Sequence, residues 1–279
     1  MSDHILDQGR PVSLLDTVDP EIAQTLLTRR DAIRRGASTS AVVAAGLGLA
    51  SAPLTLAALA RDAYGQSTRL PAVVIGVLNF ALTLEYLEGE FYQRGVDSGI
   101  IPAADRTIFD TINRHEAEHV AFLRTTLGSS ARPKPTFDFT ARGAFPTVFS
   151  NYDTFKAVAQ AFEDTGVRAY KGQAPALMPY KPVLTAALTI HSVEARHASE
   201  VRRLRGNFQD TAPNKGWITG NQTDVPGTAA VYAGEENLVQ GGVNVTTVTP
   251  VGAPGVSEAF DEPLTMAQVL EIVGPFIAA

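Results

Sequence analysis

Four segments between residues 70 and 206 repeat their apolar residues at the three-and-four spacing of amphipathic helices. Proline opens three of these segments, asparagine or aspartate opens the other, and glycine follows each one, which is the usual asymmetry of helix ends. Segments of this length are typical of helical bundles. The predicted helices run from Pro71 to near Gly95, from Pro102 to Gly128, from Asn151 or Asp153 to Gly172, and from Pro182 to Gly206.

The connections predict how these helices are arranged. Short links join the first helix to the second and the third to the fourth, so each pair is expected to form an antiparallel hairpin. Residues 129–150, between the second and third helices, form a longer stretch that contains three prolines. We therefore predict an all-α bundle over residues 67–206, in which one long crossover joins two helical hairpins.

The first 66 residues have the pattern of a targeting segment. Arg29 and Arg30 precede an uncharged run of small and apolar residues from Gly36 to Ala60. This pattern resembles a twin-arginine leader, which exports folded proteins, often with their cofactor inserted. A membrane anchor or a core helix is the alternative, because the run is long enough to span about 30 Å of hydrocarbon. An exported chain would reside in the periplasm or cell envelope, with membrane association through this segment if it is retained.

Residues 207–279 differ from the bundle in composition, being rich in Gly, Thr and Pro. Turn signals such as Pro226-Gly227 and Gly241-Gly242 are compatible with short strands or with an ordered loop in residues 207–262. Thr265 begins the sequence Thr-Met-Ala-Gln, which fits a capping box. We therefore predict an irregular C-terminal extension that ends in a short helix.

Composition narrows the chemistry. The net charge is −6, and no basic stripe suggests a nucleic-acid partner. The chain has no cysteine, which excludes disulfides, thiolate zinc sites, iron–sulfur clusters and thiol catalysis. Any metal must be held by carboxylate, imidazole, phenol or backbone oxygen, and these ligands suit iron, manganese or zinc.

The second and fourth predicted helices each contain a Glu-x-x-His sequence, Glu116 with His119 and Glu194 with His197. Residues at i and i+3 share one helix face, so each pair can direct both side chains at one metal. Both pairs lie in seams that are otherwise apolar, where a carboxylate is costly unless it is paired or bound to metal. The seams are Phe109, Ile112, Glu116, His119 and Leu123, and Ala187, Ile190, Glu194, His197, Val201 and Leu204.

The other two helices each supply a carboxylate and a tyrosine. Glu85 and Tyr92 lie seven residues apart in the first helix, as do Glu163 and Tyr170 in the third. Four site residues of the first hairpin recur in the second hairpin at a constant offset of 78 residues. The four pairs of positions are Glu85 and Glu163, Tyr92 and Tyr170, Glu116 and Glu194, and His119 and His197. Two hairpins related by a pseudo-two-fold axis would bring six ligands together, and each tyrosine is predicted to hydrogen-bond a ligand carboxylate.

Other acids and histidines are predicted to lie in solvent or beside the site rather than to bind metal. His4 falls in the leader and is expected to have no part in the site. The remaining residues of this group are Glu88, Glu90, Glu118, Glu200, His115 and His191.

These motifs allow a resemblance to be named. Residues 70–206 resemble the ferritin-like superfamily, in the branch that contains bacterial ferritin-like domain proteins and plant desiccation-related proteins. The run from Leu78 to Glu88 is similar to the first-helix pattern of that branch, and the run from Tyr232 to Asn237 is similar to its tail. The resemblance implies a ferritin-like four-helix bundle with two iron or two manganese ions per chain. It implies bridging carboxylates at Glu116 and Glu194, terminal carboxylates at Glu85 and Glu163, and terminal imidazoles at His119 and His197.

The resemblance also implies chemistry with dioxygen, ferrous ion or peroxide. Ferroxidase-like oxidation and manganese-catalase-like dismutation both fit these ligands, with a role in oxidative or desiccation stress. The alternative is a structural stress or envelope-assembly protein whose metal site is structural or idle. A homo-oligomer is compatible with either reading, but the leader and the long tail are unlike those of a hollow storage cage.

Overall fold

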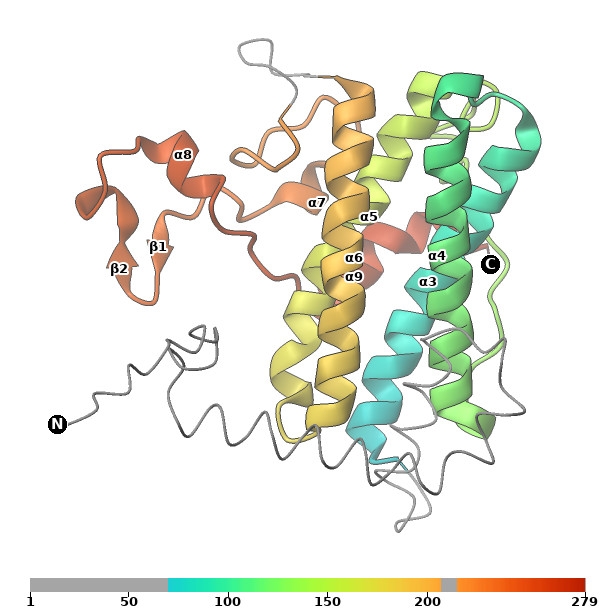
Figure 1. Ribbon diagram of the computed structural model, residues 1–279, viewed down its shortest axis with the longest axis horizontal. Coiled ribbons are helices and arrows are strands. Elements are labelled where there is room, and N and C mark those ends of the chain that lie inside the picture. Colours follow the sequence, from blue (N-terminus) through green and yellow to red (C-terminus); the bar gives the residue numbers. More distant parts are fainter. Residues whose placement is uncertain (1–69, 207–214, 279) are drawn as a thin grey trace, which may run out of the picture. The chain divides into compact units, whose positions relative to one another are not determined.

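A computed structural model of the protein describes residues 70–206 and 215–278, so the predicted leader lies outside the described residues. Helix α3 packs on α4, α5 packs on α6, and α3 also contacts α5 (Figure 1). This arrangement confirms the predicted all-α four-helix bundle. The bundle helices are α3 (Ala72–Ser98), α4 (Ala103–Leu127), α5 (Tyr152–Leu177) and α6 (Lys181–Arg205).

The crossover between α4 and α5 begins with a short 3₁₀ turn, η2 (Gly128–Ser130), and then follows the length of the bundle. As a result α4 and α5 run in the same direction, whereas each hairpin is antiparallel (Figure 1). Phe139 and Phe149 of the crossover pack against Phe91 of α3. The crossover is therefore part of the hydrophobic core rather than a solvated loop.

Helix α3 is, with α5, one of the two most buried helices of the bundle. In the described part of the chain it is also the one helix long and apolar enough to cross a membrane, judged by length and composition alone. However, 67% of its most apolar stretch is buried by the protein itself. Its Phe91 stacks on Phe155 and meets Phe162 edge to face, which joins α3 to α5.

Two of the predicted helix ends are wrong. Helix α3 continues past Gly95 to Ser98, and α5 continues past Gly172 to Leu177. A side chain at Gly95 would overlap the ring of Phe155, and one at Gly172 would overlap the backbone carbonyl of Leu264. Both glycines therefore allow a neighbour to approach the helix closely, and they do not end it.

The tail contains several short helices and strands that are joined by loops. They are α7 (Ala229–Tyr232), β1 (Val239–Gln240), β2 (Val243–Asn244), η3 (Val245–Thr247), α8 (Ala253–Ser257), α9 (Met266–Val273) and η4 (Gly274–Phe276). The two strands pair antiparallel, with Val239 opposite Asn244. The predicted capping box is confirmed, because the Thr265 side chain accepts from the Gln268 backbone N–H while the Gln268 side chain accepts from the Thr265 N–H.

The end of the tail is fixed to the bundle and the crossover. The Leu264 N–H donates to the Arg168 carbonyl of α5 at 3.1 Å, and the Phe276 ring contacts Phe162 of α5. The Asp138 N–H donates to the Phe276 carbonyl at 2.8 Å, which ties the crossover to the tail. Helix α5 is thus covered by the tail on one side, while its other side faces the bundle interior.

Candidate metal centre

The structure brings all six predicted ligand residues together in the interior of the bundle. Each Glu-x-x-His sequence lies on one face of its helix, and α3 and α5 supply the two remaining carboxylates. The four glutamates are fully buried, and the two histidines are 7% and 5% exposed. The residues are Glu85, Glu116, His119, Glu163, Glu194 and His197.

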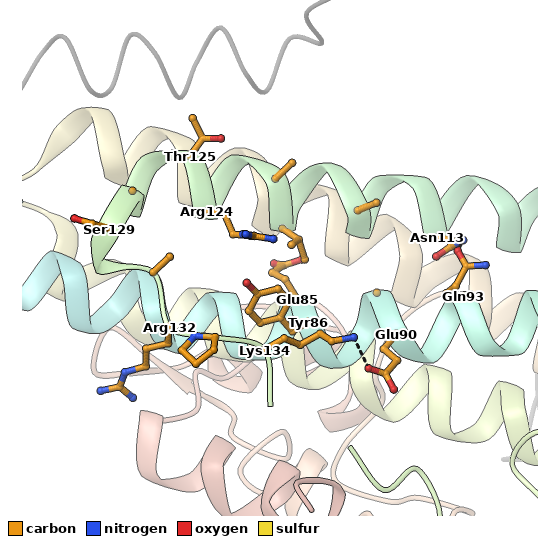
Figure 2. Close-up of a pocket in the computed structure, with 17 residues that line it drawn as sticks. Glu85, Tyr86, Glu90, Gln93, Asn113, Arg124, Thr125, Ser129, Arg132 and Lys134 are labelled. Carbon is orange, nitrogen blue, oxygen red and sulfur yellow. Dashed lines mark hydrogen bonds and ion pairs between the residues drawn. The ribbon is translucent and has the colours of Figure 1, made fainter. Parts of the chain in front are cut away.

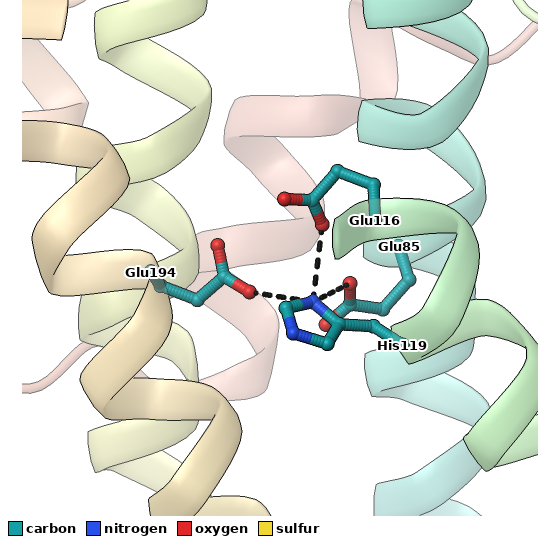
Figure 3. A group of neighbouring side chains, drawn as sticks. All are labelled: Glu85, Glu116, His119 and Glu194. Carbon is teal, nitrogen blue, oxygen red and sulfur yellow. Dashed lines mark hydrogen bonds and ion pairs between the residues drawn. The ribbon is translucent and has the colours of Figure 1, made fainter. Parts of the chain in front are cut away.

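One half of the centre is arranged around His119 (Figure 3). Its Nδ1 lies 3.1 Å from Glu85 Oε2, 3.2 Å from Glu116 Oε2 and 3.0 Å from Glu194 Oε1. These residues come from α3, α4 and α6, so the group requires three helices to be correctly packed.

The other half is arranged around His197. Its Nδ1 lies 2.9 Å from Glu116 Oε1, 3.4 Å from Glu163 Oε2 and 3.5 Å from Glu194 Oε2. Glu116 and Glu194 therefore present one oxygen to each half, whereas Glu85 and Glu163 each belong to one half. Two groups of buried ligand atoms that share two carboxylates are compatible with the binding of metal ions.

The potential metal-ligating atoms of the centre lie close to one another, but several of them have no hydrogen-bond partner in the described part of the chain. His197 Nδ1 and both oxygens of Glu194 are buried and have no hydrogen bond among the described residues, although their ion-pair distances are short. Glu116 Oε1 and Glu163 Oε2 are likewise orphaned. Such atoms are expensive unless something else binds them. Hard oxygen donors with two imidazoles fit iron or manganese, and each group of four ligand atoms lies within 4.8 Å.

The two tyrosines hold the terminal carboxylates across the bundle. Tyr92 Oη donates to Glu163 Oε1 at 2.5 Å, and Tyr170 Oη donates to Glu85 Oε1. Each phenol thus bonds the carboxylate of the opposite hairpin, and not the one seven residues earlier in its own helix. This crossed pair links α3 to α5 and fixes the free oxygen of each glutamate toward the centre.

The shifted pKa values of the ligand residues show that the buried carboxylates favour positive charge in the centre. Burial raises the pKa of Glu85 to about 8, with His119 acting in the opposite direction, and burial also raises the pKa of Glu163 well above its usual range. Burial lowers the pKa of each histidine, but the surrounding carboxylates outweigh it and hold the pKa of both above the ordinary value. The protein groups alone therefore gather protons onto the imidazoles, and metal ions would take the place of those protons.

Two residues that the sequence left aside lie beside the centre. The His115 ring stacks on His197 at 5.2 Å between centroids, and His115 Nδ1 lies 3.0 Å from His197 Nε2. Glu88 is only 3% exposed. Both were detectable as residues one helical turn from a ligand on the same face, but that spacing also occurs by chance. Glu90, Glu118, Glu200 and His191 are partly exposed.

A surface groove leads to one side of the centre. It has a volume of about 1140 Å³ and lies between α3, α4 and the start of the crossover, with Glu85 among its lining residues (Figure 2). Arg124 and Lys134 also line it, and Lys134 Nζ pairs with Glu90 Oε2 at 2.7 Å. Because the Glu85 side chain is fully buried, the groove ends against the wall of the centre and leaves the carboxylate shielded.

The comparisons with known proteins agree with this geometry. Residues 74–207 match a family described as a ferritin-like domain. The helical bundle of this chain belongs to the ferritin-like superfamily. Comparison with curated proteins and comparison with solved structures each gave no match.

Proposed function

We propose that this chain holds two iron or two manganese ions between its four bundle helices and uses them on dioxygen, ferrous ion or peroxide. The observation that carries the proposal is the shared use of Glu116 and Glu194 by two halves of one buried centre. A pair of redox-active ions held there would supply a two-electron change to dioxygen or peroxide.

The chain's own residues would prepare the site for such chemistry. The phenols of Tyr92 and Tyr170 hold the terminal carboxylates in place, which restricts their movement when the charge at the centre changes. His115 contacts the nitrogen of His197 that faces away from the carboxylates, and it is partly exposed. It would therefore orient that imidazole and fix its tautomer.

A surface groove would give a small substrate an approach from one side, with the buried Glu85 side chain between the groove and the centre. The groove that ends at Glu85 would bring a small substrate to within one side chain of the centre. Phe91, Phe155 and Phe162 pack against one another between α3 and α5 and make that part of the interior apolar. The site would thus be dry but approachable, as an oxygen-active centre requires.

The test is a metal count followed by an activity assay. Protein purified from its native source should contain about two iron or two manganese atoms per chain. The loaded protein should then consume dioxygen with ferrous ion, or decompose hydrogen peroxide. Two bound metals with no turnover of any of these substrates would contradict the proposed chemistry, whereas no bound metal after reconstitution would contradict the site.

The complete burial of the four glutamates favours a second candidate, a structural metal site in a stress or envelope protein. A structural site would raise stability on metal binding and leave dioxygen and peroxide untouched. Comparing unfolding of metal-free and loaded protein with the turnover assay separates the two, because only the first candidate predicts turnover.

We further propose that the chain is exported through its twin-arginine-like leader with the metals already inserted. Replacing Arg29 and Arg30 with lysine should leave the protein in the cytoplasm. Normal export of that double variant, measured by cell fractionation, would contradict the twin-arginine route.

A further inference from the structure

The two halves of the centre are not equivalent. The 78-residue offset relates each ligand of the first hairpin to one of the second, and it relates Glu88 of α3 to Gly166 of α5. One hairpin therefore carries a carboxylate where the other carries a hydrogen atom. The pseudo-two-fold symmetry that holds for the six ligands and the two tyrosines fails at this pair of positions, as it does at His115, whose counterpart at the same offset is Val193.

Glu88 fills the space that Gly166 leaves open. A methyl group at position 166 would lie 3.2 Å from Glu88 Oε1 and 3.9 Å from Glu194 Cγ. The carboxylate of Glu88 thus reaches across from α3 to α5, beside the bridging glutamate of α6. A methyl group at position 166 would require this carboxylate to shift by a few tenths of an ångström.

Glu88 has no counter-charge. Its side chain is 3% exposed, and among the described residues no lysine, arginine or histidine forms an ion pair with it. Burial and then the negative charges of Glu194 and Glu163 raise its pKa well above the usual range. A buried, unpaired carboxylate is strongly unfavourable unless a cation is supplied from outside the protein.

We propose that Glu88 is a seventh ligand of the metal pair, on the side of Glu163 and Glu194, and that it makes the two metal positions unequal. The inference rests on the two-metal site proposed above. Glu88 Oε1 lies against Gly166 of α5, one helical turn beyond Glu163, and the Glu194 side chain lies beside the same position. The metal position next to Glu163 therefore receives one carboxylate more than the position next to Glu85.

The extra charge has a chemical consequence. Four carboxylates neutralise two divalent ions, so a fifth favours a higher total metal charge in this low-dielectric site. Glu88 would thus strengthen binding at its own position and stabilise the oxidised state of the pair.

The experiment compares binding of Mn²⁺ to the full-length metal-free protein and to its Glu88→Gln variant by calorimetric titration. We expect two binding steps in the wild type and a loss of affinity of about 10–100-fold in one step of the variant. The metal-free variant should unfold at the same temperature or a higher one, because burial disfavours the charged form of the Glu88 carboxyl and an uncharged amide of the same shape avoids that cost. Glu90→Gln, two residues along and paired with Lys134 at the groove, is the matched control and should leave both steps unchanged.

Gly166→Ala tests the same idea without changing charge. The methyl group would shift the Glu88 carboxylate by a few tenths of an ångström, so the same binding step should weaken, by less than in Glu88→Gln. Unchanged Mn²⁺ affinities in Glu88→Gln, or equal weakening of both steps, would overturn the assignment. A loss of stability in the metal-free variant at unchanged affinity would mark Glu88 as structural. Failure of the wild type to bind Mn²⁺ at all would contradict the metal site itself.

Discussion

Helix α5 contributes to two buried polar clusters on its opposite sides, and two residues that are adjacent in the sequence belong to different clusters. Glu163 faces the metal centre, whereas Asp164 faces the tail. We call the second cluster the tail clasp and define it as Asp164, Arg168, Arg202, Tyr232 and Glu235. Both clusters are almost fully buried, but they differ in whether the protein completes their charges and hydrogen bonds.

The tail clasp is balanced by the chain itself. Arg202 Nη2 pairs with Asp164 Oδ2 at 2.6 Å, and Tyr232 Oη donates to the same oxygen at 2.8 Å. Arg168 Nε pairs with Glu235 Oε1 at 2.7 Å, and its guanidinium also donates to three backbone carbonyls. Two arginines thus face two carboxylates, and one oxygen, Glu235 Oε2, has no partner among the described residues.

The metal centre is not balanced in this way. Five donor atoms of its ligands lack a hydrogen bond in the described part of the chain, and its carboxylates outnumber its imidazoles. Burial of charged groups alone therefore does not identify a binding site. A buried cluster with its partners present serves to hold the fold, whereas one with converging orphan atoms is suited to an external cation.

The largest effect is expected from replacing the two carboxylates that both halves of the metal centre share. Glu116→Ala combined with Glu194→Ala should reduce bound metal from about two ions per chain to none, because both halves lose their bridging carboxylates. Elemental analysis after reconstitution measures this. Glu200→Ala, at a partly exposed position of α6, is the control. Retention of two metals in the double variant would refute the ligand assignment.

The next effect breaks the tail clasp. Arg168→Met should lower the free energy of unfolding by about 3–5 kcal/mol, because it leaves Glu235 buried without its counter-charge. Chemical denaturation measures the loss, and Arg114→Met, at an exposed position of α4, should change little. Adding Glu235→Gln should restore part of the stability. Metal content should stay near the wild-type value. A variant that lost metal but kept its stability would show that the tail clasp supports the metal centre rather than the fold.

A smaller effect concerns the crossed tyrosines. Tyr170→Phe should weaken the metal position that uses Glu85, and Tyr92→Phe the position that uses Glu163, each by about tenfold. Step-resolved titration with Mn²⁺ distinguishes the two variants, and Tyr180→Phe, which is partly exposed at the start of α6, serves as the control. Weakening of the same step by both substitutions would show that the phenols do not act across the bundle as the structure indicates.

A further prediction concerns the pH dependence of metal binding. The raised pKa of Glu85, about 8, means that this carboxyl holds a proton below that pH, and a metal must displace it. Metal affinity should therefore rise with pH, by about tenfold per unit for each proton displaced, and the rise should become less steep but not stop above about pH 8, because the two imidazoles still carry protons there. Titration with Mn²⁺ at pH 6, 7 and 8 checks this. An affinity independent of pH over that range would mean that metal binding displaces no proton, either from Glu85 or from the imidazoles.

Much of the fold was predictable because its signals are local. Helix starts at Pro102 and Asn151 and the capping box at Thr265 depend on residues within one turn, and the structure has them as predicted. The ends at Gly95 and Gly172 were wrong because a glycine that terminates a helix and a glycine that admits a neighbour are identical in sequence. The distinction lies in Phe155 and in the Leu264 carbonyl, which are far away along the chain.

The candidate site shows the same division. By itself the sequence determined which six residues could act together, since the Glu-x-x-His spacing and the 78-residue repeat are properties of the chain. Only the tertiary structure decided which phenol bonds which carboxylate, that Glu88 faces Gly166, and that Asp164 belongs to the tail clasp. The reason is physical: periodicity fixes the face of a helix on which a residue lies, but its partner depends on how the helices pack.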